Sequence, residues 1–256
     1  SISAVAKLLT KNEVKADGEA RKAMNDEFEK LGKKGTWDIS GVQARADVSR
    51  WAKRDGIRAN FGRIFGICSI KGSELPVGHK DRKYKGRFVF DGREGAVRDE
   101  YNEASVYNNQ GSSPATIESS KLVDAYSLMP GNEGEDGDAE QAYVQADIEG
   151  NWWASLPIEY WPPHFHKIEN PVVPLKKALY GHPDAGTQWE LKSHSHLRAQ
   201  GFVDIETSNS LFWHPNLKLL LMVYVDDFRM AGPKDNLAEG WKLIRTDSKQ
   251  GTEGLV

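Results

Sequence analysis

The spacing of apolar residues predicts an amphipathic helix near the start of the chain. Within residues 20–35, Ala23, Met24, Phe28 and Leu31 recur at intervals of one helical turn, and Gly residues then interrupt the pattern. One face of this segment is therefore apolar and the other is charged. We expect a helix that covers part of a hydrophobic core.

Shorter signals follow along the chain. Strands are expected at residues 36–40 and 86–92, and helices within residues 112–131, 184–201 and 235–247. Residues 131–137, GNEGEDG, are rich in glycine and acids and are read as a loop. Residues 155–184 are rich in proline, which predicts mostly loop with an edge strand.

The last third of the chain has the strongest strand pattern. Residues 209–232 are interpreted as strand, turn, strand, turn and strand, with Asn216 in the first turn. The second strand is almost entirely apolar and stops at Asp226 and Asp227. Helices and antiparallel hairpins together predict the α+β class.

The Asp pair raises a chemical question, because adjacent carboxylates repel one another unless a positive charge lies nearby. A solvated turn would explain the pair, since Asp is common in turns. A metal site would explain it as well, if a third carboxylate came from the end of a different strand. Asp138, which begins the segment DAEQAYVQADI, is the candidate. Such a set could hold two Mg²⁺ ions.

Composition limits the class of protein. The 256 residues are 39% hydrophobic and 10% aromatic, which is typical of a globular chain with one large domain or two lobes. The single cysteine, Cys68, excludes an intramolecular disulfide and a multi-cysteine zinc site. No apolar run reaches the ~20 residues of a membrane span. We expect an intracellular protein, cytoplasmic or nuclear.

The small net charge of −3 conceals an asymmetry along the chain. Residues 45–98 contain 14 Lys and Arg against 6 Asp and Glu, a net +8, whereas residues 99–160 contain 1 against 13, a net −12. The basic segment also carries aromatic residues, a pattern compatible with a groove for phosphates and bases. A solvated surface is the other interpretation.

Five ordered segments resemble the reverse transcriptases of copia-type retrotransposons. YVDD at residues 224–227 follows an apolar strand, and a D-x4-Y pattern at residues 138–143 lies upstream. The segments MNDEFEKLGKKGTWDI, YKGRFVFDG, LKKALYGHPDAGTQW and GFVDIETSNSLFW match further parts of that family in the same order.

The resemblance implies the fingers and palm of a right-hand polymerase, with an antiparallel palm sheet packed on helices. It divides the chain into an N-terminal extension (1–19), a fingers-like region with part of the palm (20–130), a palm with the catalytic carboxylates (131–247) and a C-terminal tail (248–256). After residue 247 we expect neither a thumb nor a ribonuclease H. A protein partner or a dimer could then supply the thumb.

The resemblance also implies roles for single residues. It makes Asp138, Asp226 and Asp227 the ligands of two Mg²⁺ ions, with Mn²⁺ as a possible substitute. It assigns the incoming deoxynucleoside triphosphate to Lys85, Arg87, Tyr143 and Gly181, with Tyr143 as the aromatic side chain that excludes a 2′-hydroxyl. Tyr224 and Val225 are expected beside the primer terminus, on a primed RNA or DNA template.

Two departures from the family pattern keep other functions open. The family's KQAPR stretch is PDAGT here (183–187), and the segment before Asp138 is unusually acidic. A catalytically idle structural or interaction subunit derived from a retroelement is therefore the second hypothesis. A metal-dependent nuclease or phosphohydrolase is the third, although no general base for a water nucleophile is evident.

Overall fold

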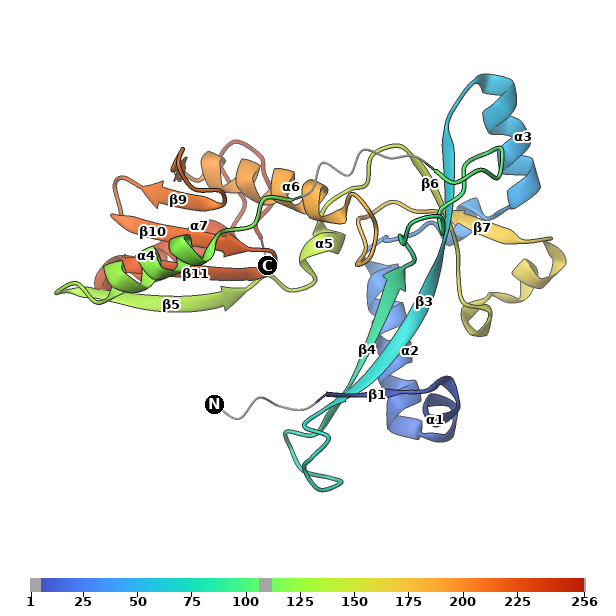
Figure 1. Ribbon diagram of the computed structural model, residues 1–256, viewed down its shortest axis with the longest axis horizontal. Helices are drawn as coiled ribbons and strands as arrows, with labels where there is room; N and C mark the ends of the chain where they lie inside the picture. Colours follow the sequence, from blue (N-terminus) through green and yellow to red (C-terminus); the bar gives the residue numbers. More distant parts are fainter. Residues whose placement is uncertain (1–5, 106–111, 256) are drawn as a thin grey trace. The chain divides into compact units, whose positions relative to one another are not determined.

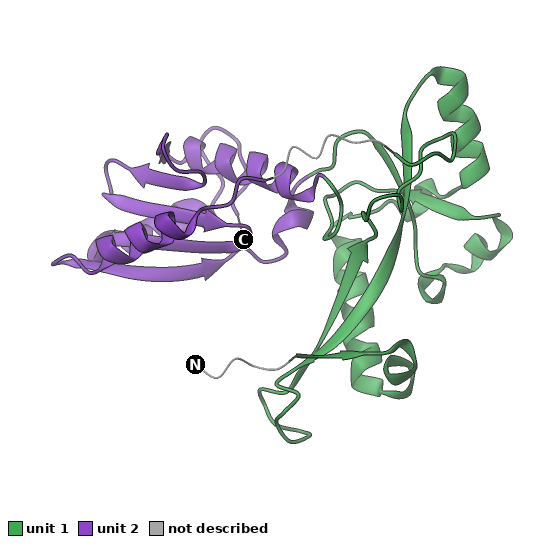
Figure 2. Ribbon diagram, in the orientation of Figure 1, with its two compact units in different colours: residues 1–108, 147–183 green, residues 109–146, 184–256 purple. Residues whose placement is uncertain are grey.

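The computed structural model describes residues 6–105 and 112–255 of the chain. These residues form two compact units, each built from two stretches of sequence (Figure 2). Unit 1 comprises residues 1–108 and 147–183, and unit 2 comprises residues 109–146 and 184–256. The first five residues of the expected N-terminal extension, residues 106–111 and the last residue of the expected tail lie outside the described residues.

Unit 1 is built on a six-stranded sheet with the order β1-β3-β6-β7-β2, in which β4 also pairs with β3 (Figure 1). All pairings are antiparallel except that of β3 with β6. Its strands are β1 (Ala6–Leu9), β2 (Gln43–Ala44), β3 (Ala59–Lys71), β4 (Lys83–Phe90), β6 (Asn151–Ser155) and β7 (Pro171–Pro174). Its helices are α1 (Lys11–Ala16), α2 (Gly18–Lys33) and α3 (Arg45–Asp55), with 3₁₀ turns η1 (Ile39–Gly41), η2 (Ile158–Tyr160) and η3 (Pro163–Lys167).

Helix α2 covers one face of β4 and leaves the other face to solvent. Gly86, Phe88 and Phe90 are buried on the covered face. A Cβ atom at Gly86 would lie 2.6 Å from the Ala23 carbonyl oxygen of α2, so glycine permits this close approach. Because side chains alternate along a strand, the cations Lys85 and Arg87 lie on the other face and are exposed.

Unit 2 is built on a five-stranded antiparallel sheet with the order β5-β11-β10-β9-β8. The strands are β5 (Asn132–Asp138), β8 (Val203–Asp204), β9 (Leu211–His214), β10 (Leu219–Tyr224) and β11 (Asp227–Pro233). The helices are α4 (Ile117–Ser127), α5 (Ala142–Gln145), α6 (Ala185–Ala199) and α7 (Lys234–Arg245).

Both faces of the unit 2 sheet are covered by helices, which explains the nearly continuous apolar run of β10. Leu219, Leu221 and Val223 join a core cluster that includes side chains of α6 and α7. The alternate residues Leu220 and Met222 join a second cluster with Val123 of α4. The central strands are thereby fixed, and the β10–β11 turn is held at the end of a rigid sheet.

Two of the predicted elements are wrong. Residues 36–40 do not form a strand: Trp37 makes only an isolated bridge, and the Asp38 carboxylate accepts bonds from Ser40 N and Gly41 N that start a 3₁₀ turn. Residues 131–137 are not a loop, because β5 occupies Asn132–Asp138 and pairs with β11 along its full length.

The mixed architecture agrees with the predicted α+β class. The helices expected near residues 20–35, 112–131, 184–201 and 235–247 correspond to α2, α4, α6 and α7. The arrangement of fingers and palm, and the domain boundaries drawn from the resemblance, remain predictions. Within residues 6–105 and 112–255, no helix combines the length and the apolar character that a membrane span requires.

Candidate active site

The two adjacent carboxylates lie at the β10–β11 hairpin turn of unit 2. Tyr224 pairs with Asp227 across the hairpin, so Val225 and Asp226 form a two-residue turn. Val225 has a φ of 58°, whereas Asp226 is not among the residues with positive φ. This is the pattern of a type II′ turn, whose first central position usually holds glycine.

The third carboxylate lies directly opposite the pair. Asp138 is the last residue of β5 and is the register partner of Asp227, the first residue of β11. The backbone N–H of Ala139 donates to the Asp226 carbonyl oxygen at 2.7 Å, which ties the turn to the end of β5. The structure thus brings Asp138, Asp226 and Asp227 to the same end of the sheet.

Two side chains near the turn, Asp227 and Tyr143, have perturbed pKa values. The pKa of Asp227 is raised by partial burial first, then by Asp226 and by its hydrogen bond with Asp138. The pKa of Tyr143 is also raised, by burial first and then by the charge of Asp226 and by Tyr224. Tyr143 therefore lies close enough to the turn to be influenced by Asp226.

These carboxylates suit a hard divalent cation, although the described residues contain no ready-made group of three metal-binding side chains. Asp138 and Asp227 are like charges in direct cross-strand pairing, a destabilising arrangement that a cation would relieve. Mg²⁺ in polymerase sites takes one or two carboxylates together with water and substrate phosphates, so a closed protein cage is not required. The donor set fits such an ion.

An exposed groove runs beside the carboxylates on the face of the sheet that α4 covers. Its lining includes Asp138, Asp227, Thr116, Ser120 and Arg229. Arg229 forms ion pairs with Asp124 of α4 at 2.5 Å and with Asp136 of β5 at 3.6 Å. This cation joins α4 to β5 and offsets part of the local negative charge.

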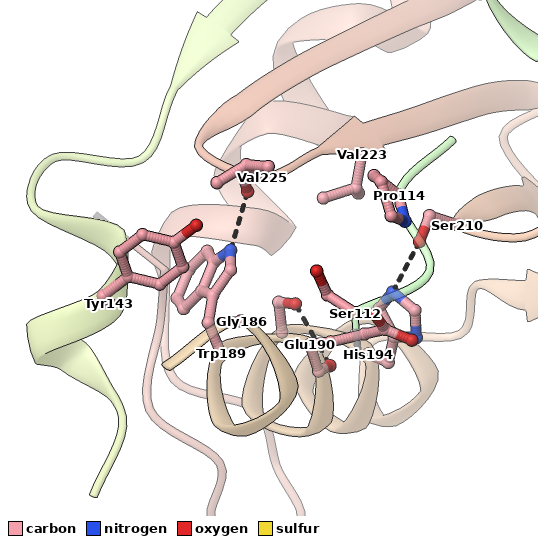
Figure 3. A pocket seen from close by; sticks show the side chains of 11 residues that line it. Ser112, Pro114, Tyr143, Gly186, Trp189, Glu190, His194, Ser210, Val223 and Val225 are labelled. Carbon is pink, nitrogen blue, oxygen red and sulfur yellow. Dashed lines mark hydrogen bonds between the residues drawn. The ribbon is translucent and has the colours of Figure 1, made fainter. Parts of the chain in front are cut away.

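The turn is also supported from the opposite face of the sheet, by a core residue whose role at the turn the sequence pattern does not predict. Trp189 of α6 donates its indole Nε1–H to the Val225 carbonyl oxygen at 2.6 Å (Figure 3). Trp189, Val225 and Tyr143 line one pocket. His194 and Ser210 line it as well and are joined by a 3.2 Å hydrogen bond. No local sequence pattern signals a bond between residues 36 positions apart.

The cations expected to bind a nucleotide lie on the exposed face of β4 in unit 1. Lys85 and Arg87 alternate with the buried residues of that strand, and Arg87 lies 5.8 Å from the centre of the Tyr180 ring. Lys83, on the same face, pairs directly with Lys71 of β3. Like charges in register are unfavourable, so this face is suited to an anion.

Gly181 also belongs to unit 1, where its conformation has a local cause. Its φ is +83°, and a Cβ atom would lie 2.2 Å from the Phe90 carbonyl oxygen. The backbone N–H of Phe90 donates to the Tyr180 carbonyl at 2.8 Å. The close approach seen at Gly181 is therefore to the end of β4. Its expected contact with nucleotide or template stays a prediction.

The predicted residues divide between the two units. Unit 2 holds Asp138, Tyr143, Tyr224, Val225, Asp226 and Asp227, and unit 1 holds Lys85, Arg87 and Gly181. The roles that the resemblance assigns to them remain predictions.

Comparison with known proteins assigns the chain to a family. A family model described as reverse transcriptase (RNA-dependent DNA polymerase) matches residues 75–248, more than half of the 256 residues. No curated protein matches the chain. The matched range contains all three carboxylates of the hairpin site and the exposed cations of β4. The chain belongs to the reverse transcriptase (RNA-dependent DNA polymerase) family.

Proposed function

We propose that the chain is a copia-type reverse transcriptase that extends a primer on an RNA or DNA template. Family membership implies a nucleic-acid template and deoxynucleoside triphosphates as substrates. The observation that carries the proposal is the pairing of Asp138 with Asp227 beside Asp226 in the hairpin turn. The three Asp residues lie at the same end of the sheet, on β5, on β11 and in the turn between β10 and β11.

Asp138, Asp226 and Asp227 would hold two divalent cations, Mg²⁺ or Mn²⁺. Such ions activate the attacking primer hydroxyl and neutralise the departing pyrophosphate in an in-line displacement. Tyr224 and Val225, in and beside the turn, would contact the primer terminus. Tyr143, whose pKa already responds to Asp226, would exclude the 2′-hydroxyl of a ribonucleotide.

The exposed β4 cations would bind the triphosphate. Arg87 offers a planar fork of donors for phosphate oxygens, and Lys85 adds a mobile point charge. Both are held in place because the other face of β4 is buried under α2. Gly181 would allow close approach of backbone to nucleotide or template.

Primer extension tests the proposal. The native chain, given a primed template, deoxynucleoside triphosphates and Mg²⁺, is compared with the double variant Asp226→Asn/Asp227→Asn. Loss of metal ligands should slow extension ~100-fold or more, since bound metal supplies several kcal/mol of charge stabilisation. Glu206→Gln removes an exposed carboxylate from the β8–β9 connection of unit 2; it is the matched control and should extend like the native chain.

Extension that persists unchanged in the Asp226→Asn/Asp227→Asn variant would contradict the proposal that these residues bind the catalytic metal ions. Failure of a folded native chain to extend any primer would favour the second hypothesis, a structural or interaction subunit.

One observation favours that alternative. Strand β5, at the edge of the unit 2 sheet, carries the exposed acids Glu133, Glu135 and Asp136 next to Asp138, and acidic side chains repel nucleic-acid phosphates. A subunit of this kind should bind a protein partner stably. A purified chain that stays monomeric and captures no partner would count against it.

A further inference from the structure

We propose that Trp189 is a positioning residue for the catalytic carboxylates, because its indole holds the Val225 peptide and thereby sets the turn that presents Asp226 and Asp227. The inference rests on the proposed function, because it requires that Asp138, Asp226 and Asp227 bind the catalytic metal ions. Its evidence is the geometry of the turn.

Val225 adopts a backbone conformation that its side chain disfavours. Its φ of 58° lies in the left-handed region, where a β-branched residue is an outlier. Glycine is the usual occupant of this position in a type II′ turn. A conformation of this kind persists only where the surrounding structure determines it.

Trp189 stabilises this conformation of Val225. Trp189 is 2% exposed and belongs to the core cluster that also contains Val223 and Phe228, which form the second register pair from the turn on β10 and β11. The indole N–H donates to the Val225 carbonyl at 2.6 Å (Figure 3). A rigid donor therefore fixes the orientation of the peptide that joins Val225 to Asp226.

The turn is held from a second side as well. The Asp226 carbonyl accepts the Ala139 N–H at 2.7 Å, next to Asp138 at the end of β5. With both carbonyls fixed, Asp226 and Asp227 have little freedom to move away from Asp138. Catalytic groups must be held within about 0.5 Å of the productive geometry, so this support bears on metal binding as well as on folding.

The test is the variant Trp189→Phe, which keeps an aromatic ring in the core and removes only the indole donor. Left without the bond, the partly buried Val225 carbonyl loses its donor, and the positive φ of Val225 is no longer favoured. We expect Mn²⁺ affinity, measured by titration without nucleic acid, to fall about tenfold. The kcat for primer extension should fall in parallel, with KM for the deoxynucleotide little changed.

Rescue separates positioning from general damage to the core. The double variant Trp189→Phe/Val225→Gly should recover most of the lost Mn²⁺ affinity, because glycine adopts positive φ without needing the bond. Trp152→Phe is the matched control in unit 1. Trp152 is buried and its indole donates to the Glu149 carbonyl at 2.9 Å. Removing this indole donor in Trp152→Phe should lower the melting temperature and leave the Mn²⁺ affinity unchanged.

A second measurement covers the case in which Trp189→Phe fails to fold. In the native chain the Trp189 indole proton, followed by NMR, should exchange with solvent as slowly as that of Trp152. Rapid exchange of the Trp189 proton alone would overturn the proposal. So would native Mn²⁺ affinity in Trp189→Phe, or a glycine variant that restores nothing.

These outcomes are distinct from failure of the proposed function. A native chain that binds Mn²⁺ but extends no primer would refute the polymerase. The metal titrations and the indole exchange would still decide whether Trp189 positions the carboxylates.

Discussion

At the scale of single residues, the site is governed by the repulsion between Asp138 and Asp227. Strand register places them opposite one another, and partial burial, Asp226 and Asp138 together raise the pKa of Asp227. The chain thus retains an unfavourable arrangement of charge where a cation would make it favourable. Such perturbed carboxylates are typical of functional sites.

This arrangement predicts how stability depends on pH. Because the pKa of Asp227 is raised in the folded chain, its contribution to stability is present below the usual value of 3.8 and is lost as pH rises through the raised value. At pH 7 without metal, Asp227→Asn should therefore be more stable than the native chain. Thermal melts at several pH values, with and without Mn²⁺, measure the difference.

Mn²⁺ should reduce the difference in stability between Asp227→Asn and the native chain, because it binds the ionised carboxylate of Asp227 and not the amide of the variant. Native and variant chains should also converge in stability at pH values below 3.8, where the carboxyl group is neutral. A native chain that is the more stable of the two at pH 7 without metal would contradict this account of the charges.

At the scale of elements, the predictions that succeeded depended on local pattern. The apolar positions of α2 are visible in the sequence because burial repeats with the period of a helix, and the apolar run of β10 is visible because both faces of that strand are buried. Strand β5 is not predicted because Gly, Asp and Glu are poor strand formers, and pairing with β11, whose residues lie 89 to 101 positions away in the sequence, overrides that preference.

In the site as well, the residues marked by a local sequence pattern could be predicted, and the residue that depends on a distant contact could not. Asp226 and Asp227 end an apolar strand, and the sequence predicts Asp138 as the third carboxylate of the site. Trp189 could not be found in this way. Its role depends on the positive φ of Val225 and on a hydrogen bond between α6 and the turn. Neither feature produces a repeating pattern of residues in the sequence.

Strand β4 carries a prediction of its own. Arg87→Ala should raise KM for the deoxynucleotide roughly 10- to 100-fold with a smaller change in kcat, since a hydrogen bond to a charged group contributes ~1.5–3 kcal/mol. Steady-state extension kinetics measure the two constants separately. Lys22→Ala, which removes an exposed cation from α2 in the same unit, should leave both constants unchanged. Equal effects of the two variants would refute a specific role for the β4 face.

At the scale of the whole molecule, each compact unit draws on two separate stretches of chain. The family match begins at residue 75, yet β4, inside the match, pairs along its length with β3 (Ala59–Lys71), which lies before it. The N-terminal residues are therefore part of the sheet that displays Lys85 and Arg87. A chain cut at the start of the match would lose the strand that supports them.

The most direct test of the central claim is primer extension by Asp138→Asn, because Asp138 comes from a different strand and joins the site only through the fold. The variant keeps the size of the side chain and removes its charge. We predict a folded chain whose extension rate with Mg²⁺ is ~100-fold or more below the native rate. Extension at the native rate would contradict a metal site built from Asp138, Asp226 and Asp227.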